Sequence, residues 1–497
     1  MIVVGGGHNG LVAAAYLAGA GRSVLVLERR PQLGGAACSD AVFPGWDAHL
    51  SRYSYLVSLL PALIVDELGL DLTLRHRRIT SYTPVGDAGI LVDNADPVAT
   101  RGALGADADA WDELAALTTS LAERVFPTMT EPLLGREDFR QLVGDDEAWE
   151  ALFERPLGEL LEKRFSRDTV RGIQLTDALI GTFTHAHATD LLPNRCYLYH
   201  VIGGGTGDWD VPVGGMGRIS GELARVAAER GAELRTDTTV TAIATDGATA
   251  RVTTVDGEIH TAGRVLSNVA PTVLASLLGA SQTVRRPEGA QLKVNMLLRR
   301  LPRLRDADVT AEQAFAGTFH VNEGYEQLDT AYRQASAGTI PELPPCEVYC
   351  HSLTDPSILG AQLQAQGLHT LTLFALHMPE RLFVDDREGS LAAARQAVLA
   401  SLDSVLAEPI EDCLAAPDTI EVMGPREIEA SLGMPGGNIW HGDLQWPFAE
   451  HPADEGRWGV ETAHPNVLVC GAGARRGGGV SGIPGRNAAM AVLGAPS

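Results

Sequence analysis

The chain has 497 residues, about three domain lengths of 150 residues, and its 45% hydrophobic and 21% charged content excludes a disordered chain or a collagen-like fibre. Its 63 acidic and 39 basic residues leave a net charge of −24, which argues against a nucleic-acid partner. The six cysteines are scattered and contain no C-x-x-C pair, so we expect a cytoplasmic protein without the redox pair of a disulfide reductase.

The chain opens with a predicted strand at 1–4, a glycine-rich turn and a helix at 11–17. A second strand over 23–27 ends at Glu28. The G-x-G-x-x-G spacing lets backbone amides approach a pyrophosphate at a helix N-terminus, and an acidic residue after the second strand binds ribose hydroxyls. The pattern therefore predicts a dinucleotide site made by Gly5, Gly7, His8, Asn9, Gly10 and Glu28. Central strands usually have five or six residues, so this short first strand leaves an N-terminal extension open.

Two further glycine segments narrow the dinucleotide to FAD. The loop after Glu28 brings Arg29, Arg30, Gly34, Gly35 and Ala36 toward the same pyrophosphate, which a plain nicotinamide site does not require. Near the other end, a strand over 467–470, a glycine loop over 471–485 and a helix over 487–493 repeat the first arrangement. Because FAD is long, we expect this second loop to hold the flavin half through Gly471, Gly478, Gly479 and Val480.

The middle of the chain is predicted to consist of two excursions from the dinucleotide-binding unit. Residues 61–200 are mostly helical in period, with helices over 109–125 and 145–165, whereas 182–199 is irregular. A second excursion over 291–417 opens with a strand at 292–298. We therefore predict an FAD-binding domain over 1–75, 203–290 and 418–497, interrupted by a substrate domain over 76–202 and 291–417.

Several other features are expected to be structural. The basic run 74–78 is interpreted as a solvated strand edge or loop, and His185 and His187 as ordinary loop residues rather than a metal site. Cys346 and Cys350 would lie on one face of a strand as core thiols. No run of 18 apolar residues occurs; the stretch 55–65, broken by Pro61, is expected to form core or substrate-tunnel wall, with transient membrane contact as the alternative.

The chain resembles the phytoene desaturase-like flavoproteins of the amine oxidase superfamily, and within them the group named pyridine nucleotide-disulphide oxidoreductase domain-containing protein 2. The segments that carry the resemblance span nearly the whole length: 3–14, 27–30 with 34–37, 51–60, 213–217, 266–271, 435–442 and 470–487. The resemblance implies an α/β fold in which a mixed α+β substrate domain interrupts a Rossmann-type FAD-binding domain. It also implies that Val240 contacts adenine through its backbone.

The resemblance implies an FAD-dependent oxidoreductase, and our leading hypothesis is dehydrogenation of a small, largely apolar substrate by hydride transfer to flavin, with oxygen or a quinone as electron acceptor. The alternatives are a redox-neutral flavin isomerase, an amine oxidase, or a non-catalytic flavin-binding partner protein. Where the family has Thr-His-Pro, this chain has Ala474-Arg475-Arg476, which argues against a carotenoid and predicts two cations near the flavin. The acid–base candidates are Lys293, Tyr199, His200 and His441; no metal site is predicted, and the oligomeric state is left open.

Overall fold

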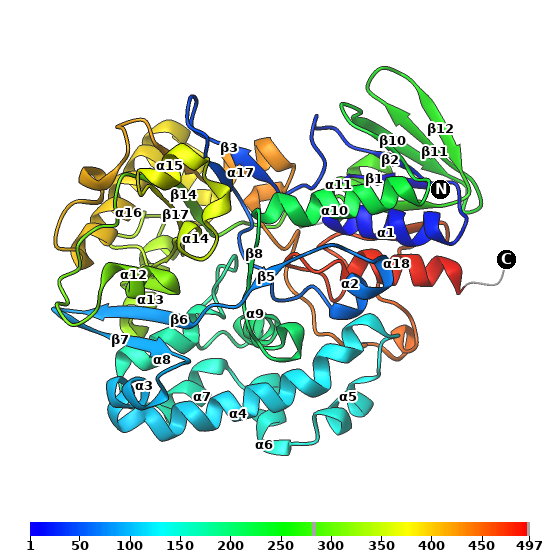
Figure 1. The fold of residues 1–497 in the computed structure, drawn as a ribbon. Helices are drawn as coiled ribbons and strands as arrows, with labels where there is room; N and C mark the ends of the chain where they lie inside the picture. Colours follow the sequence, from blue (N-terminus) through cyan, green and yellow to red (C-terminus); the bar gives the residue numbers. More distant parts are fainter. Residues whose placement is uncertain (281–284, 495–497) are drawn as a thin grey trace.

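The computed structural model describes residues 1–280 and 285–494. One half of the molecule is built on a five-stranded parallel sheet in the order β19–β13–β1–β2–β9 (Figure 1). Its strands are β1 (Ile2–Val4), β2 (Leu25–Leu27), β9 (Glu233–Arg235), β13 (Val265–Ser267) and β19 (Val467–Val469). The predicted α/β class is confirmed, because strands from both ends of the chain pair in one parallel sheet.

Helices cover this parallel sheet, which explains why β1 is apolar at every position. Helix α1 lies between α10 and α18 (Figure 1), so the first and last helices of the chain are direct neighbours. A three-stranded antiparallel sheet adds Ile243 and Val252 to the same core. Its strands are β10 (Val240–Thr245), β11 (Ala250–Thr254) and β12 (Ile259–Ala262).

The other half of the molecule contains a seven-stranded mixed sheet in the order β18–β14–β17–β16–β15–β6–β7. Its strands are β6 (Ile79–Val85), β7 (Ala88–Asp93), β14 (Leu292–Leu298), β15 (Thr318–Val321), β16 (Cys346–Tyr349), β17 (His369–Ala375) and β18 (Ile420–Met423). Two small two-stranded sheets pair β3 (Ser39–Ala41) with β4 (His49–Ser51) and β5 (Leu74–Arg75) with β8 (Val211–Pro212).

Residues 97–201 form a helical layer along one side of the molecule, which contains α3 to α9 (Figure 1). The helices up to this layer are α1 (His8–Gly19), α2 (Ala62–Leu68), α3 (Pro97–Leu104), α4 (Ala108–Val125), α5 (Arg136–Val143), α6 (Asp146–Trp149), α7 (Leu157–Arg164), α8 (Asp168–Thr176) and α9 (Leu192–Val201). Those that follow are α10 (Met216–Glu229), α11 (Pro271–Leu277), α12 (Ala311–Ala316), α13 (Tyr325–Ser336), α14 (His351–Thr354), α15 (Ala361–Ala365), α16 (Arg387–Val405), α17 (Pro425–Leu432) and α18 (Ile483–Leu493). In the described part of the chain, no helix is both long and apolar enough to cross a membrane.

The structure corrects four sequence expectations about these elements. Residues 79–93 form the β6–β7 hairpin rather than helix, because Gly86, at φ 63°, allows the tight turn that pairs the two strands. The helix expected over 145–165 is interrupted before Leu157, where Pro156 ends the preceding turn. The irregular stretch 182–199 ends in α9. Finally, β18 pairs with β14, so it joins the sheet of the predicted substrate domain rather than the FAD-binding part.

Candidate active site

The glycine loop after β1 brings three backbone segments into close contact. A side chain at Gly7 would lie 2.7 Å from Asn268 Nδ2, and one at Gly10 would overlap the carbonyl oxygen of Gly5. Glu28, buried at the end of β2, accepts a hydrogen bond of 2.7 Å from the amide of Gly6. Because only glycines fit here, the loop presents backbone rather than side chains to a bound group, as a pyrophosphate site requires.

The two glycine loops predicted from opposite ends of the chain lie against each other. His8, at the first position of α1, places Nε2 3.2 Å from the carbonyl oxygen of Gly479. Burial lowers the pKa of His8 to about 4, so the neutral ring donates this hydrogen bond at neutral pH. The sequence therefore encodes one continuous site from segments 471 residues apart.

A cavity of about 690 Å³ begins at this double loop and continues to the seven-stranded sheet. Most of the residues predicted to hold the cofactor line it: Gly5, Gly7, His8, Asn9, Glu28, Arg29, Arg30, Gly35, Ala36, Val240, Gly479 and Val480. The remaining four, Gly10, Gly34, Gly471 and Gly478, belong to the same loops but do not line the cavity. The amide of Gly34, for example, donates a hydrogen bond of 2.8 Å to the carbonyl oxygen of Gly6. A long, backbone-lined cavity of this kind fits an extended dinucleotide such as FAD.

The inner end of the cavity lies on one face of the seven-stranded sheet. Lys293 on β14 and Glu347 on β16 are both register partners of Phe374 on β17, and His320 on β15 is the partner of Glu347. These four side chains therefore form a row across consecutive strands, and all four line the cavity. Alternate residues of the same strands, including Val294, point into the apolar core on the opposite face. A register slip of one residue would bury the row in that core.

Lys293 is a buried amine without a hydrogen-bond partner among the described residues. The residue is 2% exposed, and its Nζ lies 3.7 Å from the ring centroid of Tyr55. Tyr55 in turn packs against Tyr349, with 4.7 Å between the ring centroids. Burial holds the pKa of Lys293 well below its ordinary value, so the amine is available as a neutral base.

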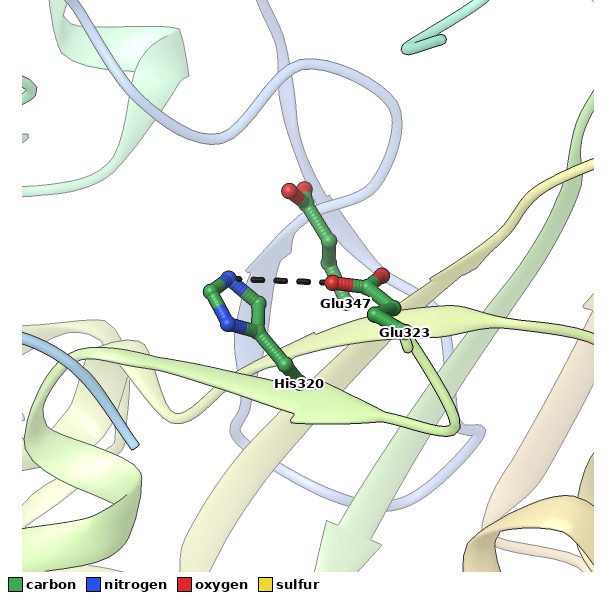
Figure 2. A group of neighbouring side chains, drawn as sticks. All are labelled: His320, Glu323 and Glu347. Carbon is green, nitrogen blue, oxygen red and sulfur yellow. Dashed lines mark ion pairs between the residues drawn. The ribbon is translucent and has the colours of Figure 1, made fainter. Parts of the chain in front are cut away.

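Beyond Tyr349 the row ends in a group of buried carboxyls. The hydroxyl of Tyr349 donates to Glu347 at 2.6 Å, and Figure 2 shows Glu323 facing the imidazole of His320, at 3.7 Å between Oε2 and Nε2. Burial, followed by the charge of Asp177, raises the pKa of Glu347 to about 8. Burial also raises the pKa of Glu323 and lowers that of His320 to about 3. Most of these groups are therefore neutral at pH 7 when nothing binds to them.

The structure separates the predicted catalytic residues into two sets. Lys293, His200 and His441 line the cavity. His441 is half-buried and adopts a left-handed backbone conformation, at φ 62°, with Nδ1 unpaired among the described residues; desolvation of the ring lowers its pKa to about 4. The ring of His200 stacks on Trp209. In contrast, Tyr199 lies off the cavity wall and donates its hydroxyl hydrogen to the carbonyl oxygen of Gln445 at 3.1 Å.

The expectation that Arg475 and Arg476 stabilise a reduced flavin is corrected. Neither residue lines the cavity. Arg476 is 1% exposed and donates to the carbonyl oxygens of Thr128, Glu131 and Trp458. Arg475 donates to the carbonyls of Trp446 and Phe448 and pairs with Glu450. The two arginines therefore hold loops together, because backbone carbonyls that lack an intrahelical or ladder partner need donors.

Sequence reasoning missed Arg77, Asp177, His320, Glu347 and Tyr349, all of which line the cavity. Arg77, taken as part of a solvated basic run, donates to Trp209 O and Thr318 Oγ1 inside the protein. For Glu347 and Tyr349 a signal was present, because they alternate with the core thiols Cys346 and Cys350 and must face the other side of the strand. The chain also has only two lysines among its basic residues, one of which is Lys293.

Comparisons with known proteins agree with this geometry. The model of the flavin containing amine oxidoreductase family matches residues 10–331. An uncharacterized protein of Mycobacterium tuberculosis is 51% identical, covering 99% of this chain and 96% of the relative. Pyridine nucleotide-disulfide oxidoreductase domain-containing protein 2 of Mus musculus is 30% identical, covering 99% and 93% of the two chains.

Solved structures share the fold over the whole chain. Cyclohexylamine oxidase from Brevibacterium oxydans superposes with a TM-score of 0.60 at 16% identity, covering 99% of this chain and 98% of the other. A putrescine oxidase bound to putrescine gives a TM-score of 0.55 at 17% identity, with coverage of 99% and 98%. The chain therefore belongs to the flavin containing amine oxidoreductase family, with FAD as its cofactor.

Proposed function

We propose that this protein is an FAD-dependent dehydrogenase that removes a hydride and a proton from adjacent atoms of an organic substrate. The observation that carries this proposal is the unpaired amine of Lys293 in a cavity continuous with the glycine loops. FAD, bound along Gly7, Glu28, Gly35 and Gly479, supplies the hydride acceptor. The protein supplies orientation, a water-poor cavity and a group that handles the proton.

Lys293 is suited to the proton step. Its side chain is buried and free of ion pairs in the described part of the chain, so desolvation holds the pKa of the amine well below its ordinary value and favours the neutral form. A neutral amine can accept a proton from the substrate directly or through a water molecule. The ring of Tyr55, 3.7 Å away, then stabilises the ammonium through its π face.

The cavity wall supports a substrate with an apolar body and one polar end. Leu114, Ile173, Ile180 and Tyr197 provide an apolar side from the helical layer. The opposite side carries the row from Lys293 to the buried carboxyls. We therefore keep the largely apolar substrate predicted from sequence, and we add a polar group at the end of the substrate that lies next to Glu347.

The test is anaerobic mixing of the FAD-loaded protein with candidate substrates while flavin absorbance is followed. We expect bleaching of the flavin and a product lighter by two hydrogens, after which oxygen or a quinone restores the absorbance. K293M should slow the bleaching, whereas K163M at the exposed second lysine should not. A product of unchanged mass without net flavin reduction would favour an isomerase, and release of ammonia would favour an amine oxidase.

A further inference from the structure

The side chains of His320, Glu323 and Glu347 converge at the inner end of the cavity. His320 and Glu347 are cross-strand partners on β15 and β16, and Glu323 lies two residues after the end of β15 (Figure 2). One donor atom from each residue lies within 4.8 Å of the other two, and all three residues are buried. The His320 and Glu323 side chains are only 5% and 0% exposed.

In the described part of the chain, the nearest charged partner of Glu323 is the imidazole of His320, at 3.7 Å between Oε2 and Nε2. Among the described residues, no group donates a hydrogen bond of normal geometry to either carboxylate oxygen, and the Thr176 hydroxyl is the nearby donor that acts on it. Buried polar atoms are almost always satisfied, so an unpaired carboxylate aimed at an imidazole and a second carboxylate indicates a missing ligand. The imidazole nitrogen and the carboxylate oxygens all offer lone pairs. A ligand that contacts all three is therefore positively charged.

Further hydrogen bonds orient two of the three donors. Thr83 Oγ1 lies 2.8 Å from His320 Nδ1. If the Nδ1 proton is donated to this hydroxyl, the lone pair of Nε2 is directed at Glu323. The hydroxyl of Tyr349 donates to one oxygen of Glu347 at 2.6 Å and leaves the other free. Such outer contacts are typical of metal-ligating histidines and carboxylates.

We propose that His320 Nε2, Glu323 and Glu347 bind a divalent first-row transition-metal ion. One imidazole nitrogen with two carboxylate oxygens suits Zn²⁺ or Mn²⁺, which such ligands bind at about 2.0–2.2 Å. A bound divalent ion would favour the ionised form of both glutamates, whose pKa values are otherwise raised by burial. This revises the sequence expectation that the protein has no metal site.

The geometry favours an ion over a cationic group on a substrate. Glu347 and His320 line the cavity, but Glu323 lies behind them and is not part of the wall. A small ion can sit between all three, whereas a group attached to a larger molecule would reach only the two on the wall. The remaining coordination positions of the ion would face the cavity. The metal site goes beyond the proposed flavin chemistry and shares Glu347 with the polar end of the same cavity.

The experiment uses the FAD-loaded protein, cleared of metals with a chelator and dialysed against MnCl₂ or ZnCl₂. Metal content by mass spectrometry should show one ion per chain in the wild type and in E326Q, a matched change at an exposed glutamate three residues away. E323Q and E347Q should lose the ion, and T83V should bind it about 10- to 100-fold more weakly. FAD content and melting temperature verify that each variant is folded.

A second measurement does not depend on the stability of the glutamate variants. Pulsed electron paramagnetic resonance of bound Mn²⁺ should show coupling to an imidazole nitrogen, and H320Q should abolish it. An ion-free wild type would overturn the proposal and leave the carboxyls to a cationic group of an organic ligand. Equal metal in the wild type and E323Q would also overturn it, because the binding would then be adventitious.

Discussion

Gly10 tests how closely α1 must approach the cofactor loop. A Cβ at this position would overlap the carbonyl oxygen of Gly5 and lie 3.1 Å from Asn268 Nδ2. Asn268 donates to the same carbonyl at 3.2 Å, so neither neighbour can yield without losing a hydrogen bond. In G10A the helix must therefore move away by about 1 Å to reach a favourable contact distance near 3.5 Å.

We expect G10A to cost about 1–3 kcal/mol of stability, as overpacking typically does. Because the displaced helix N-terminus and loop form the dinucleotide site, FAD affinity should fall about 10- to 100-fold, at about 1.4 kcal/mol per factor of ten. The assays are the FAD-to-protein ratio after gel filtration, the Kd from reconstitution, and the melting temperature.

The matched control is G221A on α10. Gly221 is exposed, and a Cβ added there would meet no atom within 4 Å beyond its chain neighbours and the backbone of its own helix. Alanine is the better helix former by about 1 kcal/mol, so G221A should raise the melting temperature and leave FAD binding unchanged. If G10A kept the FAD content and melting temperature of the wild type, the reasoning would be refuted. Alanine would then be tolerated at Gly10 although its Cβ overlaps the carbonyl oxygen of Gly5.

Three further variants have defined outcomes. K293M should slow substrate-dependent flavin reduction about 100-fold or more. K293M should also remove a pH dependence of stability. Because burial lowers the pKa of Lys293, the free energy of unfolding of the wild type should rise as the pH approaches 10.5. In thermal melts from pH 6 to 10, K293M should therefore be stabilised most at the low-pH end. R476A should lose about 3 kcal/mol or more in denaturant titrations, because three carbonyls lose their donor, while the flavin midpoint potential stays unchanged; a shifted potential would restore the role predicted from sequence. E28A should weaken FAD retention about tenfold in dialysis, and full retention would exclude Glu28 from the site.

The dinucleotide site could be predicted in detail because its determinants are local. The strand, the glycines from Gly5 to Gly10 and the acidic Glu28 lie within 28 residues, and each follows from backbone geometry that a short sequence reveals. The second loop at 471–485 was recognised through the same local pattern. Its contact with the first loop, through His8 and Gly479, needed only the assumption that one FAD molecule spans both.

The inner end of the cavity could not be predicted in this way. Lys293, His320, Glu347 and Phe374 come from four strands separated by tens of residues, and only their register places them in one row. The alternation within β16 indicated that Glu347 faces away from the core thiols, but nothing local indicated what it faces. The β6–β7 hairpin, which supplies Thr83, lies within a segment whose spacing of apolar residues predicts mostly helix.

The sequence by itself determined the fold class, the cofactor and the loops that receive it, because backbone turns of this kind are encoded over short spans. The tertiary structure decided which charged side chains enter the cavity. Arg475 and Arg476 lie within a cofactor loop in sequence but donate to backbone carbonyls away from the cavity, whereas Arg77 belongs to a basic run but donates to groups inside the protein. The direction in which each arginine side chain points depends on partners that are distant in sequence. A buried charge needs hydrogen-bond or charge partners, and only the fold decides which groups lie beside it.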